Sequence, residues 1–84
     1  MPYIKPDERK AFDEAIARLG NITTPGELNY VITRLCHQYL LNKGTNYDNL
    51  NAITGVLECS KLEITRRLTA PYEDNKIKIN GDVF

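Results

Sequence analysis

The sequence predicts a mainly α-helical fold: a three-helix bundle-like domain with an extended N-terminal segment and a short C-terminal β-hairpin or arm. Three observations support this prediction. Apolar residues recur every three or four positions over most of the chain, proline-containing helix start signals precede the first two of these stretches, and the loops between them are short. The chain has 84 residues, which is enough for a single domain, residues 1–84, with a core near the lower size limit for a stable monomer.

The first predicted helix covers residues 6–19. Residues 1–5 are expected to be extended because prolines follow Met1 and Lys5, and the residue before a proline disfavours the helical region. Pro6 suits the first turn of a helix, and Gly20 is a natural C-terminal stop. The apolar face of this helix consists of Phe12, Ala15, Ile16 and Leu19.

The second predicted helix, residues 24–43, has the sharpest start signal in the chain. Thr24 stands at the N-cap, Pro25 at the first helical position and Glu27 three residues after the cap. This is the capping-box arrangement, in which each side chain satisfies a free backbone N–H. Gly44 closes the helix. The apolar stripe consists of Leu28, Val31, Ile32, Leu35 and Tyr39.

The third predicted helix runs from residue 46 to residue 70, with Asn46 as its cap and Pro71 as its stop. It would be about 36 Å long against about 21 Å for the first helix, at 1.5 Å per residue. Part of it therefore needs a further cover, from the tail or from another subunit. Its apolar face consists of Leu50, Ile53, Leu57, Ile64 and Leu68.

The tail, residues 71–84, has a strand-like alternation of isoleucines and lysines, followed by Asn80-Gly81. This pair suits a type I′ turn, so we predict a hairpin. A two-stranded hairpin is marginal in water. It would need the N-terminal segment as a third strand, the spare face of the third helix or a neighbouring subunit. A frayed tail is the alternative.

A second apolar surface is predicted opposite the core stripe of the third helix. Glycine, cysteine and leucine occur there in place of the charges usual on a solvated face, and the tail adds further apolar residues. We interpret this surface as one that packs on the tail or on another copy, and we expect a homo-oligomer. Its residues are Gly55, Cys59, Leu62, Ile77, Ile79, Val83 and Phe84.

Arginines and tyrosines gather on faces away from the predicted core, and we interpret them as candidate ligand contacts. A guanidinium can take a phosphate while an aromatic ring stacks on a base. The alternative is structural: an ordinary solvated face on the second helix, and a helix C-terminus stabilised by cations and by a Glu63–Arg67 pair on the third. The candidate residues are Tyr30, Arg34, Arg66, Arg67 and Tyr72.

Composition excludes several classes of function. The formal net charge is zero, whereas binding to duplex nucleic acid needs a basic excess, so we expect no such partner. With neither a signal peptide nor an apolar run near 18 residues, we expect no membrane association and a cytoplasmic location. No metal-ligand spacing occurs, since Cys36 and His37 are adjacent on a helix and point about 100° apart; we therefore expect no metal and no cofactor.

The stretches MPYIKPDERK, GELNYVITRL, GVLECSKLEITRR and PYEDNKIKINGDVF together resemble a family of short, uncharacterised proteins of tailed bacteriophages and related mobile elements. The resemblance covers nearly the whole chain and implies a phage protein in the host bacterial cytoplasm. Small phage accessory proteins often act by binding.

The leading expectation is a non-enzymatic homo-oligomer that sequesters a small nucleotide-like ligand, such as a cyclic nucleotide defence signal. The alternative is a protein-interaction module that binds a host or virion protein. A third hypothesis, an enzyme that processes a nucleotide, would depend on His37, Cys59 or Glu63; no catalytic residue is assigned.

Overall fold

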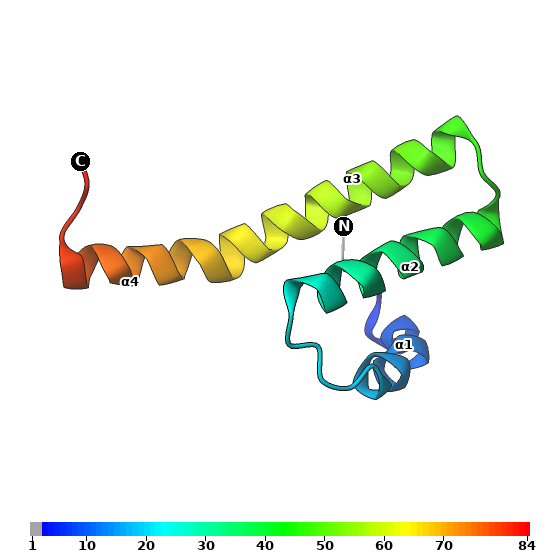
Figure 1. The fold of residues 1–84 in the computed structure, drawn as a ribbon, viewed down its shortest axis with the longest axis horizontal. Helices are drawn as coiled ribbons and strands as arrows, with labels where there is room; N and C mark the ends of the chain where they lie inside the picture. Colours follow the sequence, from blue (N-terminus) through cyan, green and yellow to red (C-terminus); the bar gives the residue numbers. More distant parts are fainter. Residues whose placement is uncertain (1–2) are drawn as a thin grey trace. The chain divides into compact units, whose positions relative to one another are not determined.

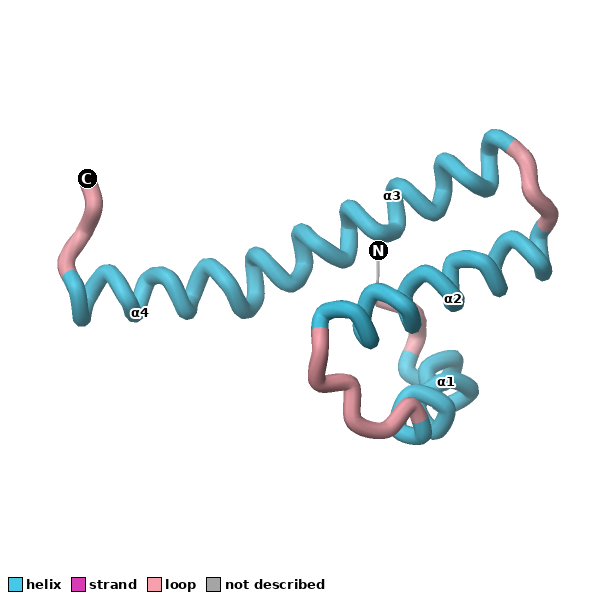
Figure 2. The backbone as a smooth tube through the Cα atoms, viewed as in Figure 1, coloured by secondary structure: helices cyan, strands magenta, loops and turns pink. Residues whose placement is uncertain are grey.

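The computed structural model describes residues 3–84, which form a mainly helical chain (Figure 1). The chain divides into two compact units, Tyr3–Ile53 and Thr54–Phe84. No strand occurs within residues 3–84, as the backbone tube in Figure 2 also shows. In chain order the elements are α1 (Pro6–Arg18), α2 (Pro25–Lys43), α3 (Tyr47–Ile64), a wide π-helical turn η1 (Thr65–Thr69) and α4 (Ala70–Asn80).

The start of α1 follows the sequence signals. Lys5 is extended, with φ −63° and ψ 146°, and Pro6 opens the helix. Arg9 Nε donates a hydrogen bond of 2.9 Å to the carbonyl oxygen of Ile4, which ties the entering segment to the first turn. Residues 3–5 lie outside any helix, as expected, while Met1 and Pro2 of the predicted extended segment lie outside the described residues.

The predicted capping box of α2 is confirmed. The Glu27 backbone N–H donates to Thr24 Oγ1 at 3.1 Å, and the Thr24 backbone N–H donates to Glu27 Oε1 at 3.0 Å. At the other end, the Gly44 N–H donates to the Leu40 carbonyl, and Gly44 has φ 104°. That backbone conformation favours glycine, so Gly44 ends the helix as predicted.

A three-residue connection fixes the start of α3. Asn46 is the predicted cap, and its Oδ1 accepts a hydrogen bond of 2.9 Å from the Asn49 backbone N–H. The Asn49 side-chain amide in turn donates to the carbonyls of Lys43 and Gly44, at 3.3 and 2.9 Å. One asparagine therefore satisfies carbonyls at the end of α2 from the first turn of α3.

The prediction that Pro71 stops the third helix is wrong. Helical backbone continues through η1 and α4 to Asn80. A proline inside an α-helix lacks an N–H and its ring clashes with the carbonyl four residues earlier. The wide turn immediately before Pro71 relieves this conflict, since the Ala70 N–H bonds to Thr65, five residues back. Thr65 Oγ1 also donates to the Lys61 carbonyl at 2.9 Å, a contact that tends to bend helices.

The predicted C-terminal β-hairpin is also wrong. Asn80 is the last residue of α4, and Gly81 is its C-cap, with φ 90° and an N–H that donates to the Ile77 carbonyl at 2.9 Å. A glycine with positive φ serves a helix C-terminus as well as a tight turn. The Asn-Gly signal was therefore real, but it marks the end of a helix, and the all-α class holds for the whole described chain.

No side chain within residues 3–84 is buried. The residues with intermediate exposure are few and are mostly apolar or small. Large apolar side chains are exposed in both units, from Tyr3 to Phe84. The half-covered positions are Ile22, Val31, Cys36, Leu40, Asn49, Ala52, Ile53, Cys59 and Glu63.

Candidate functional site

The predicted ligand residues belong to two different units. Tyr30 and Arg34 lie on α2, within Tyr3–Ile53, whereas Arg66 and Arg67 lie in η1 and Tyr72 in α4, within Thr54–Phe84. Each group is therefore considered alone.

Tyr30 and Arg34 form the predicted pair on α2. Arg34 Nη1 donates a hydrogen bond of 2.6 Å to the Tyr30 hydroxyl, and the guanidinium carbon lies 5.6 Å from the ring centroid. Four-residue spacing on one helix face brings the side chains together. The hydroxyl uses one N–H of the five that a guanidinium carries, so the pair presents a positive charge and an aromatic ring to solvent on an exposed helix face.

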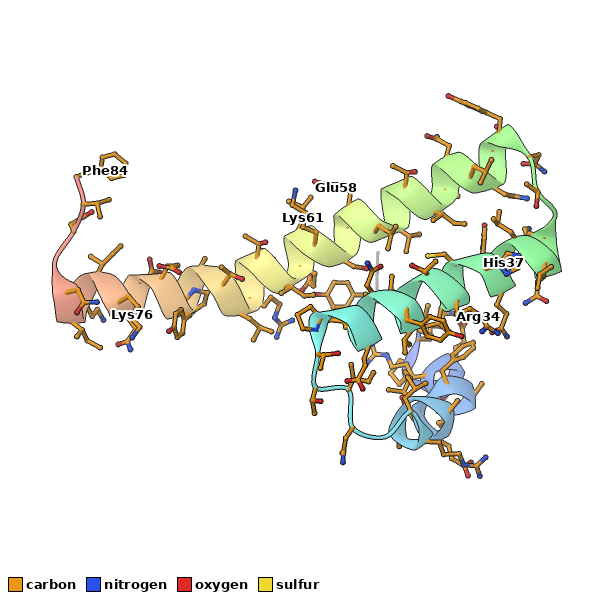
Figure 3. All side chains as sticks on the ribbon, viewed as in Figure 1. Arg34, His37, Glu58, Lys61, Lys76 and Phe84 are labelled. Carbon is orange, nitrogen blue, oxygen red and sulfur yellow. The ribbon has the colours of Figure 1, made fainter. Side chains whose placement is uncertain are left out.

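A shallow hollow of about 270 Å³ lies beside this pair and is lined by Arg34, Leu35, His37, Gln38 and Leu41. Arg34 and His37 are labelled on α2 in Figure 3. All of the lining comes from a single helix, so the hollow is a surface depression between side chains. Its lining combines the Arg34 guanidinium and the Gln38 amide with two leucines, a combination suited to an anionic ligand with an apolar part.

A second hollow, of about 420 Å³, lies between the end of α1, the following loop and the first turns of α2. Tyr30 belongs to its lining, which connects it to the Tyr30–Arg34 pair. Most of the other residues are apolar or small, and Glu27 supplies the one acidic group of this lining. The full lining is Leu19, Asn21, Ile22, Gly26, Glu27, Tyr30 and Val31.

Glu27 is held ionised by the capping box. Its carboxylate accepts hydrogen bonds from the backbone N–H groups of Thr23 and Thr24, and these lower its pKa below the ordinary value of 4.5. Hydrogen bonds to the charged form of an acid stabilise that form. The Glu27 carboxylate therefore has a structural role, because it stabilises the N-terminus of α2.

Arg66 and Arg67 both pair with Glu63. The distances to Glu63 Oε1 are 3.0 Å from Arg66 Nη2 and 3.6 Å from Arg67 Nη1. The Glu63 side chain is only 23% exposed, while those of both arginines are largely exposed. The predicted Glu63–Arg67 pair is thus present, and the cluster carries one net positive charge at the wide turn.

Tyr72 lies in the first turn of α4, and the Lys76 ammonium is 5.5 Å from its ring centroid. This is a cation–π contact between residues four apart on one helix face. The aromatic ring that was predicted to stack on a base is thus covered on one side by a side chain of its own helix.

An apolar stripe in the second unit was only partly predicted. Leu57, Ile64 and Leu68 belong to the predicted core face of the third helix. Because the helix continues past Pro71, Tyr72 and Ile79 extend the same spacing. The spacing of these residues was visible in the sequence. Tyr72 and Ile79 were not assigned to the helix because Pro71 was expected to end it. The stripe, called the C-terminal stripe below, consists of Leu57, Ile64, Leu68, Tyr72 and Ile79.

The residues of the predicted tail-packing or oligomer surface all lie in the second unit. Cys59 is half-covered, while Leu62 is exposed. Ile77 and Ile79 belong to α4, so they follow α3 along one helical path. The remaining members lie on α3 or beyond Gly81: Gly55, Val83 and Phe84. Whether this surface packs on another copy stays a prediction.

Neither a metal centre nor a membrane span is formed by the described residues. Within residues 3–84 no three histidine, cysteine or acidic side chains gather where they could hold a metal ion. Both cysteines, Cys36 and Cys59, are free thiols. No helix of this part of the chain combines the length and the apolar character needed to cross a bilayer.

The fold and these surfaces define a class: a small all-helical protein whose apolar residues lie on exposed helix faces. Residues 1–83 match the family described as Domain of unknown function (DUF6899), and the chain belongs to that family. Comparison with curated proteins and with solved structures gave no match.

Proposed function

We propose that this chain is a non-enzymatic binding protein that acts as a homo-oligomer. The observation that carries the proposal is the absence of any buried side chain in residues 3–84 together with the exposure of large apolar side chains in both units. Contiguous exposed apolar surface marks sites of protein association. In this proposal, other copies supply the cover that residues 3–84 do not give one another.

Energetics support a partner for the second unit in particular. A large apolar side chain contributes about 1.5–3 kcal/mol when it is fully buried. Isolated helices gain little stability from propensity alone and depend on packing of one face. The unit Thr54–Phe84 is a single helical path with a proline inside it, so packing of its apolar residues against another surface would supply most of its stability.

The test of this proposal is the mass of the native particle. Light scattering from the purified full chain should give a multiple of 9.6 kDa, with thermal unfolding that depends on protein concentration, since subunits that associate only when folded stabilise one another by mass action. A monomer that unfolds cooperatively at a concentration-independent temperature would overturn it.

A small nucleotide-like ligand is the second part of the proposal, and the Tyr30–Arg34 pair supports it. The pair places a cation and a ring within one side-chain length of each other, next to a hollow that also contains His37. A phosphate can pair with Arg34 while a base stacks on Tyr30. Sequestration of a cyclic nucleotide defence signal by a phage accessory protein in bacterial cytoplasm is the setting that we propose for such a ligand.

Calorimetric titration with a panel of cyclic mononucleotides and dinucleotides tests the ligand. Heat with the native chain that is lost in Arg34→Gln, and retained in the control Asn42→Ala, an exposed residue of the same helix outside the hollow, would support it. No heat with any member of the panel would refute it and would favour the alternative, a host or virion protein as partner, which pull-down from bacterial lysate would then identify.

A further inference from the structure

The hollow of about 420 Å³, called the Gly26 hollow below, is formed by the end of α1, the following loop and the first turns of α2. Three segments of the chain therefore contribute to it, whereas a single helix lines the hollow beside Arg34. Apolar walls with an aromatic ring suit the planar part of a small ligand. Here those walls are Leu19, Ile22, Val31 and the ring of Tyr30.

Gly26 keeps this hollow open. It is the second residue of α2, and its φ is not positive, so the backbone conformation does not require glycine. A Cβ at this position would meet no heavy atom within 4 Å beyond its chain neighbours and the backbone of its own helix, so packing does not require glycine either. Glycine is less favourable than alanine in a helix. What Gly26 provides is space, because a larger side chain there would occupy part of the hollow.

Glu27 gives the Gly26 hollow a hydrogen-bond acceptor. The bonds that it accepts from Thr23 and Thr24 all reach one oxygen, Oε1, at 3.0 to 3.3 Å. An ionised carboxylate has a second oxygen, accepts only, and has about four acceptor sites in all. The other oxygen can therefore accept from a ligand while Oε1 stays in the capping box. An edge that presents N–H donors fits this group, and an edge that presents an acceptor is repelled.

The Tyr30–Arg34 pair determines the direction of the ligand. The Tyr30 ring lines the Gly26 hollow, and its hydroxyl accepts the 2.6 Å hydrogen bond from Arg34. Because the hydroxyl is neutral, this bond leaves the charge of the guanidinium uncompensated. Glu27 precedes Tyr30 on α2 and Arg34 follows it, about 10 Å apart along the helix axis at 1.5 Å per residue. An anionic group is therefore attracted to the Arg34 end, and a donor-bearing ring to the Glu27 end.

We propose that the Gly26 hollow selects a guanine base, with Glu27 accepting from its donor edge and Gly26 making room for the ring. Guanine presents two donors side by side, the ring N1–H and the exocyclic amino group, whereas adenine and cytosine place an acceptor nitrogen beside their amino group. This inference rests on the proposed nucleotide ligand at Tyr30 and Arg34 and specifies which base that nucleotide carries.

Calorimetric titration of the full chain with cyclic GMP, cyclic IMP and cyclic AMP tests the selection. Cyclic IMP differs from cyclic GMP only in lacking the exocyclic amino group. Cyclic GMP should bind about tenfold more tightly than either of the others, as expected for a hydrogen bond to a charged group. In Glu27→Gln this preference should disappear, because the amide oxygen can keep the capping role while the amide nitrogen turns a donor toward the base.

Gly26→Leu tests the space in the hollow. The added side chain should lower the affinity for cyclic GMP at least about tenfold, since it fills the volume assigned to the base. Asn42→Leu is the matched control, because it adds the same side chain to an exposed position of α2 outside both hollows. Circular dichroism checks that both variants keep the native helix content. If Gly26→Leu does not fold, the comparison of cyclic GMP with cyclic IMP on the native chain decides.

The outcomes separate this inference from the proposed function. Equal affinities for the three nucleotides, a preference that survives Glu27→Gln, or unchanged binding of cyclic GMP in folded Gly26→Leu would overturn the guanine site. If binding in those cases is still lost in Arg34→Gln, the proposed nucleotide ligand stands. No heat with any of the three nucleotides, or binding that survives Arg34→Gln, would overturn both. The proposed homo-oligomer is measured separately, by the mass of the particle.

Discussion

The two units of this chain are held by different kinds of interaction. In Tyr3–Ile53, side chains close the ends of the helices: Thr24 and Glu27 cap α2, and Asn49 bonds to the two carbonyls before α3. In Thr54–Phe84, one helical path runs through a proline and ends at Gly81. It presents apolar side chains to solvent along its length.

This difference distinguishes interactions that set the ends of individual helices from interactions that can join one chain to another. Caps and glycines fix where helices begin and end, and they act over three or four residues. An exposed apolar stripe defines a surface that can pack on another molecule, but it does not by itself determine which molecule that is. The first unit is thus defined mainly by its own local signals, whereas we propose that a partner completes the second. Substitutions that act on one kind of interaction should have little effect on the other.

The largest expected effect is loss of association in Leu68→Glu. Two copies each lose a central leucine worth about 1.5–3 kcal/mol when buried, and 1.4 kcal/mol corresponds to a tenfold change. The dissociation constant measured by sedimentation should therefore rise at least about 100-fold. Leu62→Glu is the matched control, because Leu62 lies on the same helix, off the stripe, and is comparably exposed. If Leu62→Glu lost association and Leu68→Glu kept it, the surface first predicted around Cys59 would be the one that associates.

Pro71→Ala should stabilise the second unit. It restores a backbone N–H and removes a ring clash inside a helix, an effect of up to about 3 kcal/mol. Chemical denaturation should show a higher free energy of unfolding, and circular dichroism more helix. Pro25→Ala, at the first position of α2, is the contrasting change, since proline is favourable there. If both substitutions had the same effect, the helical path through Pro71 would be contradicted.

Thr24→Ala should destabilise the first unit by about 1 kcal/mol, because it removes the side-chain oxygen that accepts the Glu27 backbone N–H. Thermal unfolding with a probe in residues 3–53 measures the change. Thr24→Ser keeps the hydroxyl and should restore most of the stability. If Thr24→Ala lost association while its helix content stayed that of the native chain, helix capping in the first unit and association through the second would not be independent.

The smallest expected effect is on the acid response of α2. The pKa of Glu27 is lowered in the folded chain by the Thr23 and Thr24 backbone N–H groups. The ionised carboxylate therefore stabilises the fold above the ordinary pKa of 4.5, and this contribution is lost as the pH falls through the lowered value. Helix content followed between pH 6 and pH 2 should decline less steeply in Glu27→Gln. An unchanged acid profile would contradict the role of the carboxylate.

Much of the first unit could be predicted from the sequence because its signals are local. Thr24, Glu27, Asn46 and Gly44 each act on backbone groups within a few residues, and each has the predicted role. The extended Lys5 before Pro6 follows from the same kind of rule.

The tail could not be predicted in this way because two local rules gave the wrong answer. Pro71 does not end the helix, since the wide turn at Thr65–Thr69 accommodates it. Asn80-Gly81 ends a helix and forms no hairpin turn. Among the candidate ligand residues, the sequence gave the correct neighbours within one helix: Tyr30 with Arg34, and Glu63 with Arg67. It contained no information about surfaces between chains beyond the spacing of the apolar stripe.

Native mass spectrometry of the full chain tests the central claim most directly, since it reports both the number of subunits and any small molecule bound to them. The account predicts particles with two or more 9.6 kDa subunits, which dissociate in Leu68→Glu and persist in Leu62→Glu. A single 9.6 kDa species at all concentrations, with the same unfolding temperature in both variants, would contradict it.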